Sequence, residues 1–296
     1  MIKLSFDLFN NEYLLYERLI VLLASFIPSL FLVGITLYSD RKSREPNKNI
    51  IICLISGIFT ISLARFFEQL VAPYIASEAT LTYVWAILEE LSKILIFYLF
   101  IFDNKYYDDI YDGPVYMAII ALSFAAVENL MYAFSESTID KSVSLALMRD
   151  LTTIPLHVIC GVVIGYFLSL ANFSKTKKNK FYNIFFAIFI AGIIHGTYNT
   201  FMGYLARIDV DYTNTIMVLS LVVIPLVVII CALFYVALRF IKKTVKLNGI
   251  YIRNEKYSGK YSYLMNQEEY IISNFHIKRI AAYDKLNSRI RRNKVK

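Results

Sequence analysis

Long apolar runs separated by short polar stretches dominate the pattern of this chain. Seven runs stand out, at about 19–37, 49–66, 81–102, 115–134, 143–170, 181–204 and 215–240. A helix needs about 20 apolar residues to cross roughly 30 Å of hydrocarbon, and these runs have about that length. The pattern predicts an all-α protein, a polytopic transmembrane bundle of about seven membrane helices.

Basic residues between the runs predict which side of the membrane each loop occupies. Short cytosolic loops carry an excess of Lys and Arg, and the loops after the first and fifth runs are the basic ones. Their basic residues are Arg41, Lys42, Arg44, Lys48, Lys175, Lys177, Lys178 and Lys180. Seven crossings then place the N-terminus outside and the C-terminus in the cytosol.

The composition agrees with a membrane protein and directs attention to the tail. Hydrophobic residues make up 57% of the 296 positions and charged residues 18%, which is too apolar for a soluble protein of this length. The net charge is +8, but 15 of the 31 Lys and Arg residues lie at or after Arg239. This asymmetry indicates membrane topology and excludes nucleic acid as the expected partner.

Two parts of the chain are therefore expected. Residues 1–242 would form the membrane bundle, with its core helices at about 81–204. Residues 243–296 would form a basic cytosolic tail, partly helical, that either binds anionic lipid headgroups or only enforces topology.

Ionisable residues are concentrated in the four central runs, whereas the interiors of the first, second and last runs contain none. A charge at mid-bilayer costs on the order of 3 kcal/mol, so several together persist only when they pair, neutralise or line a polar cavity. Such a set predicts a functional site. Its members are Glu89, Glu90, Lys93, Glu128, His157 and His195.

The spacing of the acidic residues indicates how they are held. Lys93 lies four residues after Glu89 and three after Glu90, so either carboxylate can pair with it on one helix face. We expect an ion pair of Glu90 with Lys93 to orient Glu89. Glu128 and Tyr132 share a face of the next predicted helix.

The histidines lie in motifs that suggest chemistry. His195 and Asn199 share a helix face, which places an imidazole beside a carboxamide, as activation of water and stabilisation of an oxyanion require. His157 lies one turn before Gly161 and Gly165, which form a face for close helix approach. The structural alternative for His157 is a hydrogen bond to a backbone carbonyl.

Arg149 and Asp150 lie near the start of the fifth run, at the end of that helix that the predicted topology places outside. The sequence suggests that they pair with each other or with Glu136, and that Arg149 gates the site.

Four motifs in order resemble those of the PrsW family, over about the central half of the chain. They are Glu89-Glu90-Leu-Ser-Lys93; Phe124-Ala-Ala-Val-Glu128-Asn129-Leu-Met-Tyr132; the stretch 149–157 followed by Gly161 and Gly165; and His195-Gly196-Thr-Tyr198-Asn199. The last motif departs from the family pattern, because Asn199 stands where an Asp often occurs. This departure argues against Asn199 as a metal ligand.

The resemblance implies a bacterial intramembrane peptidase that cleaves membrane-anchored proteins, such as anti-sigma factors or similar single-pass regulators. Related CaaX-type peptidases imply that Glu89 acts as general base, with Glu128 or His157 sharing that task. His195 and Asn199 would stabilise the oxyanion. The resemblance gives Glu90 a place among the catalytic residues, and Lys93, Asn129, Tyr132 and Arg149 a place as accessory residues of the site.

The sequence leaves the mechanism and two other functions open. A zinc ion could be held by Glu128, His157 and His195 with water as fourth ligand, or Glu89 could activate water without metal. Intramembrane Glu, Lys and His residues also suit a proton-coupled transporter or ion pathway, although no inverted repeat is visible. A non-catalytic scaffold or sensor is the third reading.

Overall fold

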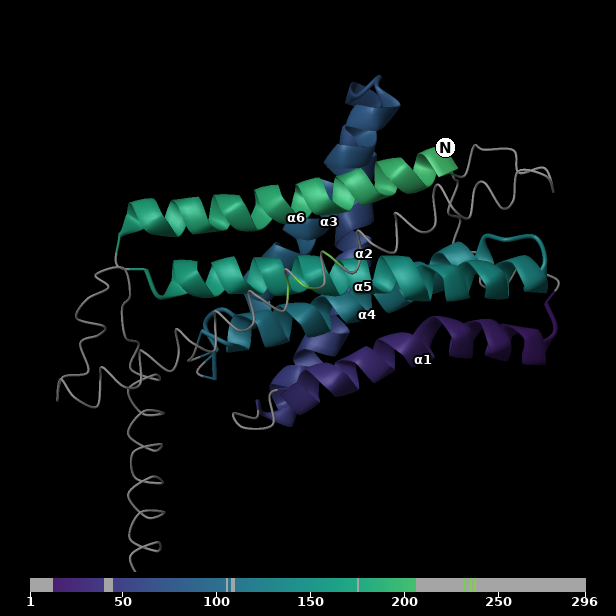
Figure 1. The fold of residues 1–296 in the computed structure, drawn as a ribbon, viewed down its shortest axis with the longest axis horizontal. Helices are drawn as coiled ribbons and strands as arrows, with labels where there is room; N and C mark the ends of the chain where they lie inside the picture. The colour runs from purple at the N-terminus through teal and green to yellow at the C-terminus, as the bar shows by residue number, and fades with distance from the viewer. Residues whose placement is uncertain are drawn as a thin grey trace, which may run out of the picture.

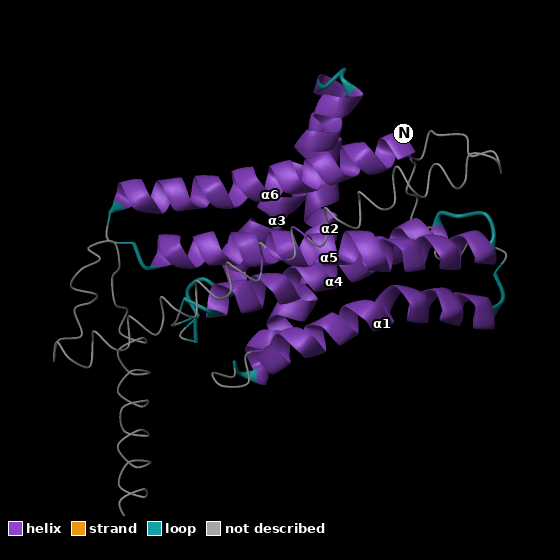
Figure 2. Cartoon of the chain, viewed as in Figure 1, coloured by secondary structure: helices purple, strands orange, loops and turns teal. Residues whose placement is uncertain are grey.

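The computed structural model describes residues 13–39, 45–104, 106–107, 110–174 and 176–205, together with Ala232, Tyr235 and Ala237. The described segments form long helices joined by short connections (Figures 1 and 2). In chain order they are α1 (Leu15–Ser39), α2 (Asn47–Val71), the 3-10 turn η1 (Ala72–Tyr74), α3 (Glu78–Phe100), α4 (Asp112–Phe134), α5 (Ile139–Asn172) and α6 (Lys177–Leu205). The first six predicted runs coincide with these helices, and the all-α class is confirmed.

Within the described residues, five helical segments are long and apolar enough to cross a membrane: α1, α2 continued through η1, α4, α5 and α6. The helix α3 has 23 residues, but Glu89, Glu90 and Lys93 interrupt its apolar middle. Multiple spans of this length confirm a multi-pass membrane protein. The total of seven crossings and the outward N-terminus stay predictions.

The predicted seventh run at 215–240 and the basic tail at 243–296 lie almost entirely outside the described residues. Ala237 is the informative exception. Its side chain is buried and packs with Ala118 of α4 and with Ile159 and Val162 of α5. One position of the seventh run therefore lies against the centre of the bundle.

The helices α4 and α5 form the centre of the molecule. Most of each is buried, whereas most residues of α1 and α6 are only partly buried or exposed. In Figure 1, α1, α4, α5 and α6 run side by side, and α2 and α3 form a hairpin that crosses them steeply. The helix α3 packs against α6 and α2, and α4 packs against α1, α2 and α5. The middle of α3 therefore meets the centre of the bundle.

Glycines allow α4 and α5 to approach closely, as the sequence predicted. A Cβ atom built on Gly161 would lie 2.7 Å from the carbonyl oxygen of Met117, and one on Gly165 would lie 2.3 Å from that of Gly113. Ordinary side chains cannot occupy these positions unless the helices move apart. The close contact fixes α5 relative to α4 along the turns that follow His157.

We expect Gly165→Ala to lower stability by about 1–3 kcal/mol, because the new methyl group would overlap the backbone of α4. Gly34→Ala on α1 is the matched control, since nothing lies within 4 Å of a Cβ atom there. Thermal unfolding in detergent would measure both. Equal melting temperatures for the two variants would contradict the role of Gly165.

Candidate active site

A buried ion pair occupies the middle of α3. The Nζ atom of Lys93 lies 2.7 Å from Oε1 of Glu90, and both side chains are completely buried. Of the two pairs that the spacing allowed, the structure forms the Glu90–Lys93 pair. Lys93 also lies over the ring of Phe124, 4.2 Å from its centroid. The ammonium group is thus enclosed by a carboxylate and an aromatic face.

His157 of α5 joins this pair to α4. Its Nδ1 lies 3.1 Å from Nζ of Lys93, and its Nε2 lies 3.2 Å from Oε2 of Glu128. An ammonium group can only donate, so Nδ1 accepts and Nε2–H donates to Glu128. Both nitrogens bond side chains, so the alternative of a histidine satisfied by a backbone carbonyl is not what the structure forms.

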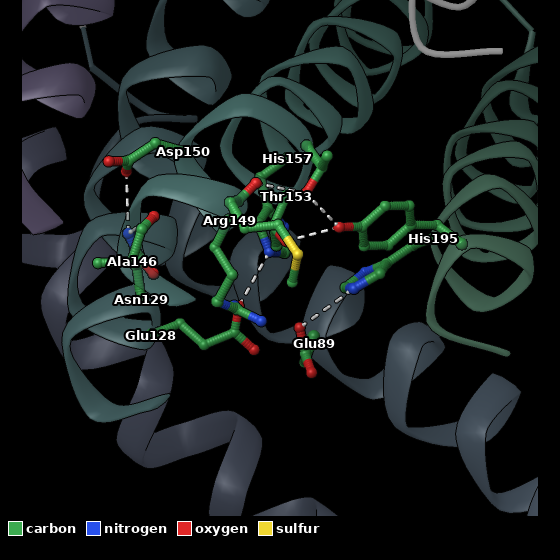
Figure 3. Close-up of polar contacts among 12 residues, drawn as sticks. Glu89, Glu128, Asn129, Ala146, Arg149, Asp150, Thr153, His157 and His195 are labelled. Atoms are coloured by element: carbon green, nitrogen blue, oxygen red, sulfur yellow. Dashed lines mark hydrogen bonds and ion pairs between the residues drawn. The ribbon is translucent and has the colours of Figure 1, made fainter. Parts of the chain in front are cut away.

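His195 of α6 connects the two glutamates of α3. Its Nδ1 lies 2.8 Å from Oε1 of Glu90 and therefore donates its proton to that carboxylate. Nε2 then carries a lone pair and lies 3.7 Å from Oε2 of Glu89, the contact drawn in Figure 3. The Oε2 atom of Glu89 is buried and has no hydrogen-bond partner among the described residues. A basic nitrogen and an unsatisfied carboxylate oxygen thus lie opposite each other across a short gap.

Glu128 of α4 pairs with Arg149 of α5, with Nη2 2.7 Å from Oε2. The guanidinium group also stacks over Tyr132, 4.1 Å from its centroid. The prediction that Arg149 pairs with Asp150 or Glu136 was wrong. The reason is the rotation of α5, which turns Arg149 towards α4 and places the two charges on facing helices.

Asp150 has a partner of its own on α4. Its Oδ1 accepts a hydrogen bond of 2.9 Å from Nδ2 of Asn129 (Figure 3). Asn129 follows Glu128, and Asp150 follows Arg149, so two adjacent polar contacts join the same two helices. The second contact therefore holds the register in which the first can form.

An ion pair on α2 also lies near the buried glutamates. This helix continues to Val71, beyond the predicted end of its run, and thereby includes Glu68, whose buried carboxylate lies 2.9 Å from Nη1 of Arg65. Arg65 also interacts electrostatically with Glu128 and Glu89. The sequence did not indicate this pair as part of the site, because Arg65 lies at the end of an apolar run whose interior contains no charges.

The charges around this centre do not balance. Glu68, Glu90 and Glu128 are each bonded to an Arg or a Lys, and Glu89 is the remaining carboxylate of the four. No Arg or Lys of the described residues bonds Glu89, and its side chain is only 8% exposed. A buried carboxylate without a cationic partner is costly. Glu89 is therefore the group of this cluster that is ready to take a proton or a cation.

Tyr198 is a member of the site that the sequence analysis did not select. Its hydroxyl donates to Oγ1 of Thr152 at 2.8 Å and lies 2.7 Å from Oγ1 of Thr153. Tyr198 is three residues after His195, the spacing of one helix turn, and this could have identified it. Asn199 instead lines a separate space between α3 and α6 with Glu78, Ala79 and Thr82.

Three side chains could hold a metal ion. Glu89, His157 and His195 each offer one ligand atom, and these atoms lie within 4.8 Å of one another. Two imidazoles and one carboxylate are a ligand set of catalytic zinc. This set contains Glu89 where the sequence analysis had placed Glu128. The hydrogen bond from His195 to Glu90 is the outer contact that zinc-binding histidines usually have.

A family model described as PrsW family intramembrane metalloprotease matches residues 45–230, a stretch that contains every site residue named above. The chain belongs to the PrsW family. It is accordingly a membrane-embedded protease of bacteria, and the enzyme class predicted from the sequence is confirmed.

Curated PrsW proteases support this assignment. "Protease PrsW" of Clostridioides difficile is 29% identical over 188 residues, which cover 62% of this chain and 79% of that protein. "Protease PrsW" of Geobacillus kaustophilus is 27% identical over 60% of this chain and 76% of its own length. That of Bacillus subtilis is 31% identical over 38% of this chain and 49% of its length. No solved structure matches the chain.

Proposed function

We propose that this PrsW protein hydrolyses a peptide bond of a membrane-anchored protein, a single-pass regulator such as an anti-sigma factor, at a centre formed by Glu89 and His195. One observation carries the proposal. The buried, unpartnered Oε2 of Glu89 lies 3.7 Å from Nε2 of His195, a nitrogen whose lone pair is left open by the bond from Nδ1 to Glu90.

The gap between these atoms suits a water molecule. A separation of 3.7 Å is too long for a direct hydrogen bond, and a water beside it can donate one proton to each atom. Glu89 then takes a proton as the water oxygen attacks the carbonyl carbon of the substrate. The C–N bond breaks when the leaving amine receives that proton, which returns Glu89 to its carboxylate form.

Negative charge that develops on the carbonyl oxygen needs a donor. Arg149 is a positive charge beside the centre, and its buried Nε–H has no partner in the part of the chain that the structure describes. His195 can donate from Nε2 only after it takes up a proton, because its Nδ1–H is already used by Glu90. We therefore assign the main electrostatic role to Arg149. The predicted role of Asn199 in the oxyanion site stays a prediction.

Glu90, Lys93 and His157 would position the reacting groups. Glu90 accepts from both Lys93 and His195 and so fixes the orientation of the imidazole. His157 bridges Lys93 and Glu128, which holds α3, α4 and α5 in register. Groups held by buried hydrogen bonds need little reorganisation during the reaction.

The family description as metalloproteases and the ligand set make zinc the metal to test. Glu89, His157 and His195 would hold it, and His157 would first have to exchange one of its two hydrogen bonds. Bound zinc supplies a Lewis acid and an activated water at neutral pH. Glu128, which bonds Arg149, would remain outside this set.

We expect purified protein to contain zinc, and we expect Glu89→Gln and His195→Ala to lose it while Glu128→Gln retains it. Metal analysis of the detergent-purified variants by mass spectrometry would measure this. A loss of zinc in Glu128→Gln with retention in Glu89→Gln would favour the ligand set of Glu128, His157 and His195. Full activity of a zinc-free protein in chelator would assign activation of water to Glu89 alone.

The proposed function is tested by comparing membrane proteomes of cells that express the wild type or Glu89→Gln at equal levels. We expect single-pass membrane proteins to appear as shorter fragments only with the wild type. Identical fragments in both strains would refute Glu89 as the catalytic base. A complete lack of fragments under several envelope stresses would count against proteolysis of such substrates.

A further inference from the structure

The reacting groups lie almost completely inside the protein. His157 is fully buried, His195 is 1% exposed and Glu89 is 6% exposed. A polypeptide substrate must therefore be bound and guided by surfaces next to these residues. Among the described residues, a candidate surface lies between α3 and α6, one to two helix turns from His195 and Glu89, and the mechanism above does not use it.

This surface is an open groove between the first turns of α3 and the last turns of α6. Among its lining residues are Ala79 and Thr82 of α3 and Asn199, Gly203 and Tyr204 of α6. We call it the α3–α6 groove.

The separation of the two helices explains why the groove exists. At Gly196 they touch, since a Cβ atom there would lie 2.3 Å from the ring of Tyr83, and at Gly192 one would lie 2.7 Å from Ile87. At Gly203, two turns further along α6, no described residue lies within 4 Å of a Cβ atom. The helices therefore diverge beyond Gly196 and leave space between their ends.

The groove is aligned with the reacting groups. Thr82 lies seven residues before Glu89, which is two turns or about 10 Å along the same face of α3. Asn199 lies four residues after His195, which is one turn or about 6 Å along the same face of α6. A chain that lies in the groove would reach the gap between Glu89 and His195 by passing over the contact of Tyr83 with Gly196.

The polar groups of the groove suit a peptide backbone. The hydroxyls of Thr82 and Thr200 donate to the carbonyl oxygens of Glu78 and Gly196 in their own helices. The carboxamide of Asn199 offers both a donor and an acceptor, which matches a peptide N–H and C=O.

We propose that the α3–α6 groove binds the extended segment of the substrate polypeptide that lies next to the cleaved bond, with Asn199 bonding its backbone. About three extended residues span the distance from Thr82 to Glu89, since a strand rises roughly 3.3 Å per residue. This inference rests on the proposed function, because it assumes that Glu89 and His195 are the reacting centre.

The test fills the groove without touching the reacting groups. Gly203→Leu places a side chain in the open space, and Gly34→Leu on α1 is the matched control because nothing lies within 4 Å of a Cβ atom there either. Cleavage of a substrate found by the proteome comparison is followed with purified full-length protein. We expect Gly203→Leu to raise KM by roughly tenfold with kcat nearly unchanged, and Gly34→Leu to match the wild type.

A crosslinking experiment gives an independent readout. A photoreactive amino acid at Ala79, in the Glu89→Gln background, should capture the substrate, whereas the same group at Gly34 should not. The proposed role of the groove would be overturned if Gly203→Leu had the wild-type KM and Ala79 captured no substrate. If Glu89→Gln were inactive in the same experiments, the proposed function would stand. Full activity of Glu89→Gln would overturn the proposed function, and this inference with it.

Discussion

Replacement of Glu89 by glutamine is expected to lower kcat by about 10²–10⁴-fold, the usual contribution of a general base. Glutamine has nearly the same shape as glutamate but cannot accept the proton that water releases. Glu89 is also a member of the one metal-ligand set found in the described residues, so the loss is expected with or without zinc. The measurement is the cleavage rate of a purified single-pass substrate in lipid nanodiscs.

The matched control for this variant is Glu45→Gln, the same substitution at another buried carboxylate. Glu45 accepts a hydrogen bond from Tyr116, near the start of α2, and takes no part in the proposed reaction. We expect its cleavage rate to remain close to that of the wild type. A Glu89→Gln enzyme that retains most of its rate would remove Glu89 from the mechanism.

Lys93→Met is expected to destabilise the fold by about 3–5 kcal/mol, the cost of breaking a buried ion pair from one side. Methionine keeps the length of the side chain but leaves Glu90 completely buried without its cation. Trp85, the only tryptophan of the chain, also lies on α3, so its fluorescence can follow unfolding in a titration with a denaturing detergent.

The double variant Lys93→Met/Glu90→Gln separates charge from packing. Removal of both charges should recover much of the lost stability, because a neutral pair has no uncompensated buried charge. Activity should remain low, since a glutamine at position 90 no longer fixes His195 as a carboxylate does. If Lys93→Met unfolds at the same detergent concentration as the wild type, the ion pair does not stabilise α3.

The sequence by itself determined the class of the protein and indicated most of the ionisable residues of its candidate site. Runs of about 20 apolar residues can satisfy their backbone in lipid only as helices or closed barrels, so length and composition sufficed for the first six helices. Ionisable residues are costly in such helices, so their position inside apolar runs marked a set of candidate site residues: Glu89, Glu90, Lys93, Glu128, His157 and His195. The motifs that they form also indicated the PrsW family, which the family model confirmed.

Only the tertiary structure decided which of these groups bond one another. Lys93 could have paired with either glutamate of α3, and the positions of His157 and His195 on other helices select Glu90. This selection leaves Glu89 as the free carboxylate. Periodicity specifies one face of one helix, but the partner across an interface depends on the rotation and crossing of both helices.

The same reason explains the other differences between the sequence-based predictions and the structure. Arg149 pairs with Glu128 because α5 packs closely on α4. The pair Arg65–Glu68 reaches the site because α2 is longer than its apolar run and crosses α4 steeply. The divergence of α3 and α6 beyond Gly196 opens the groove at Asn199. Close approach and crossing of helices are properties of the assembled bundle, and no single segment of the sequence contains them.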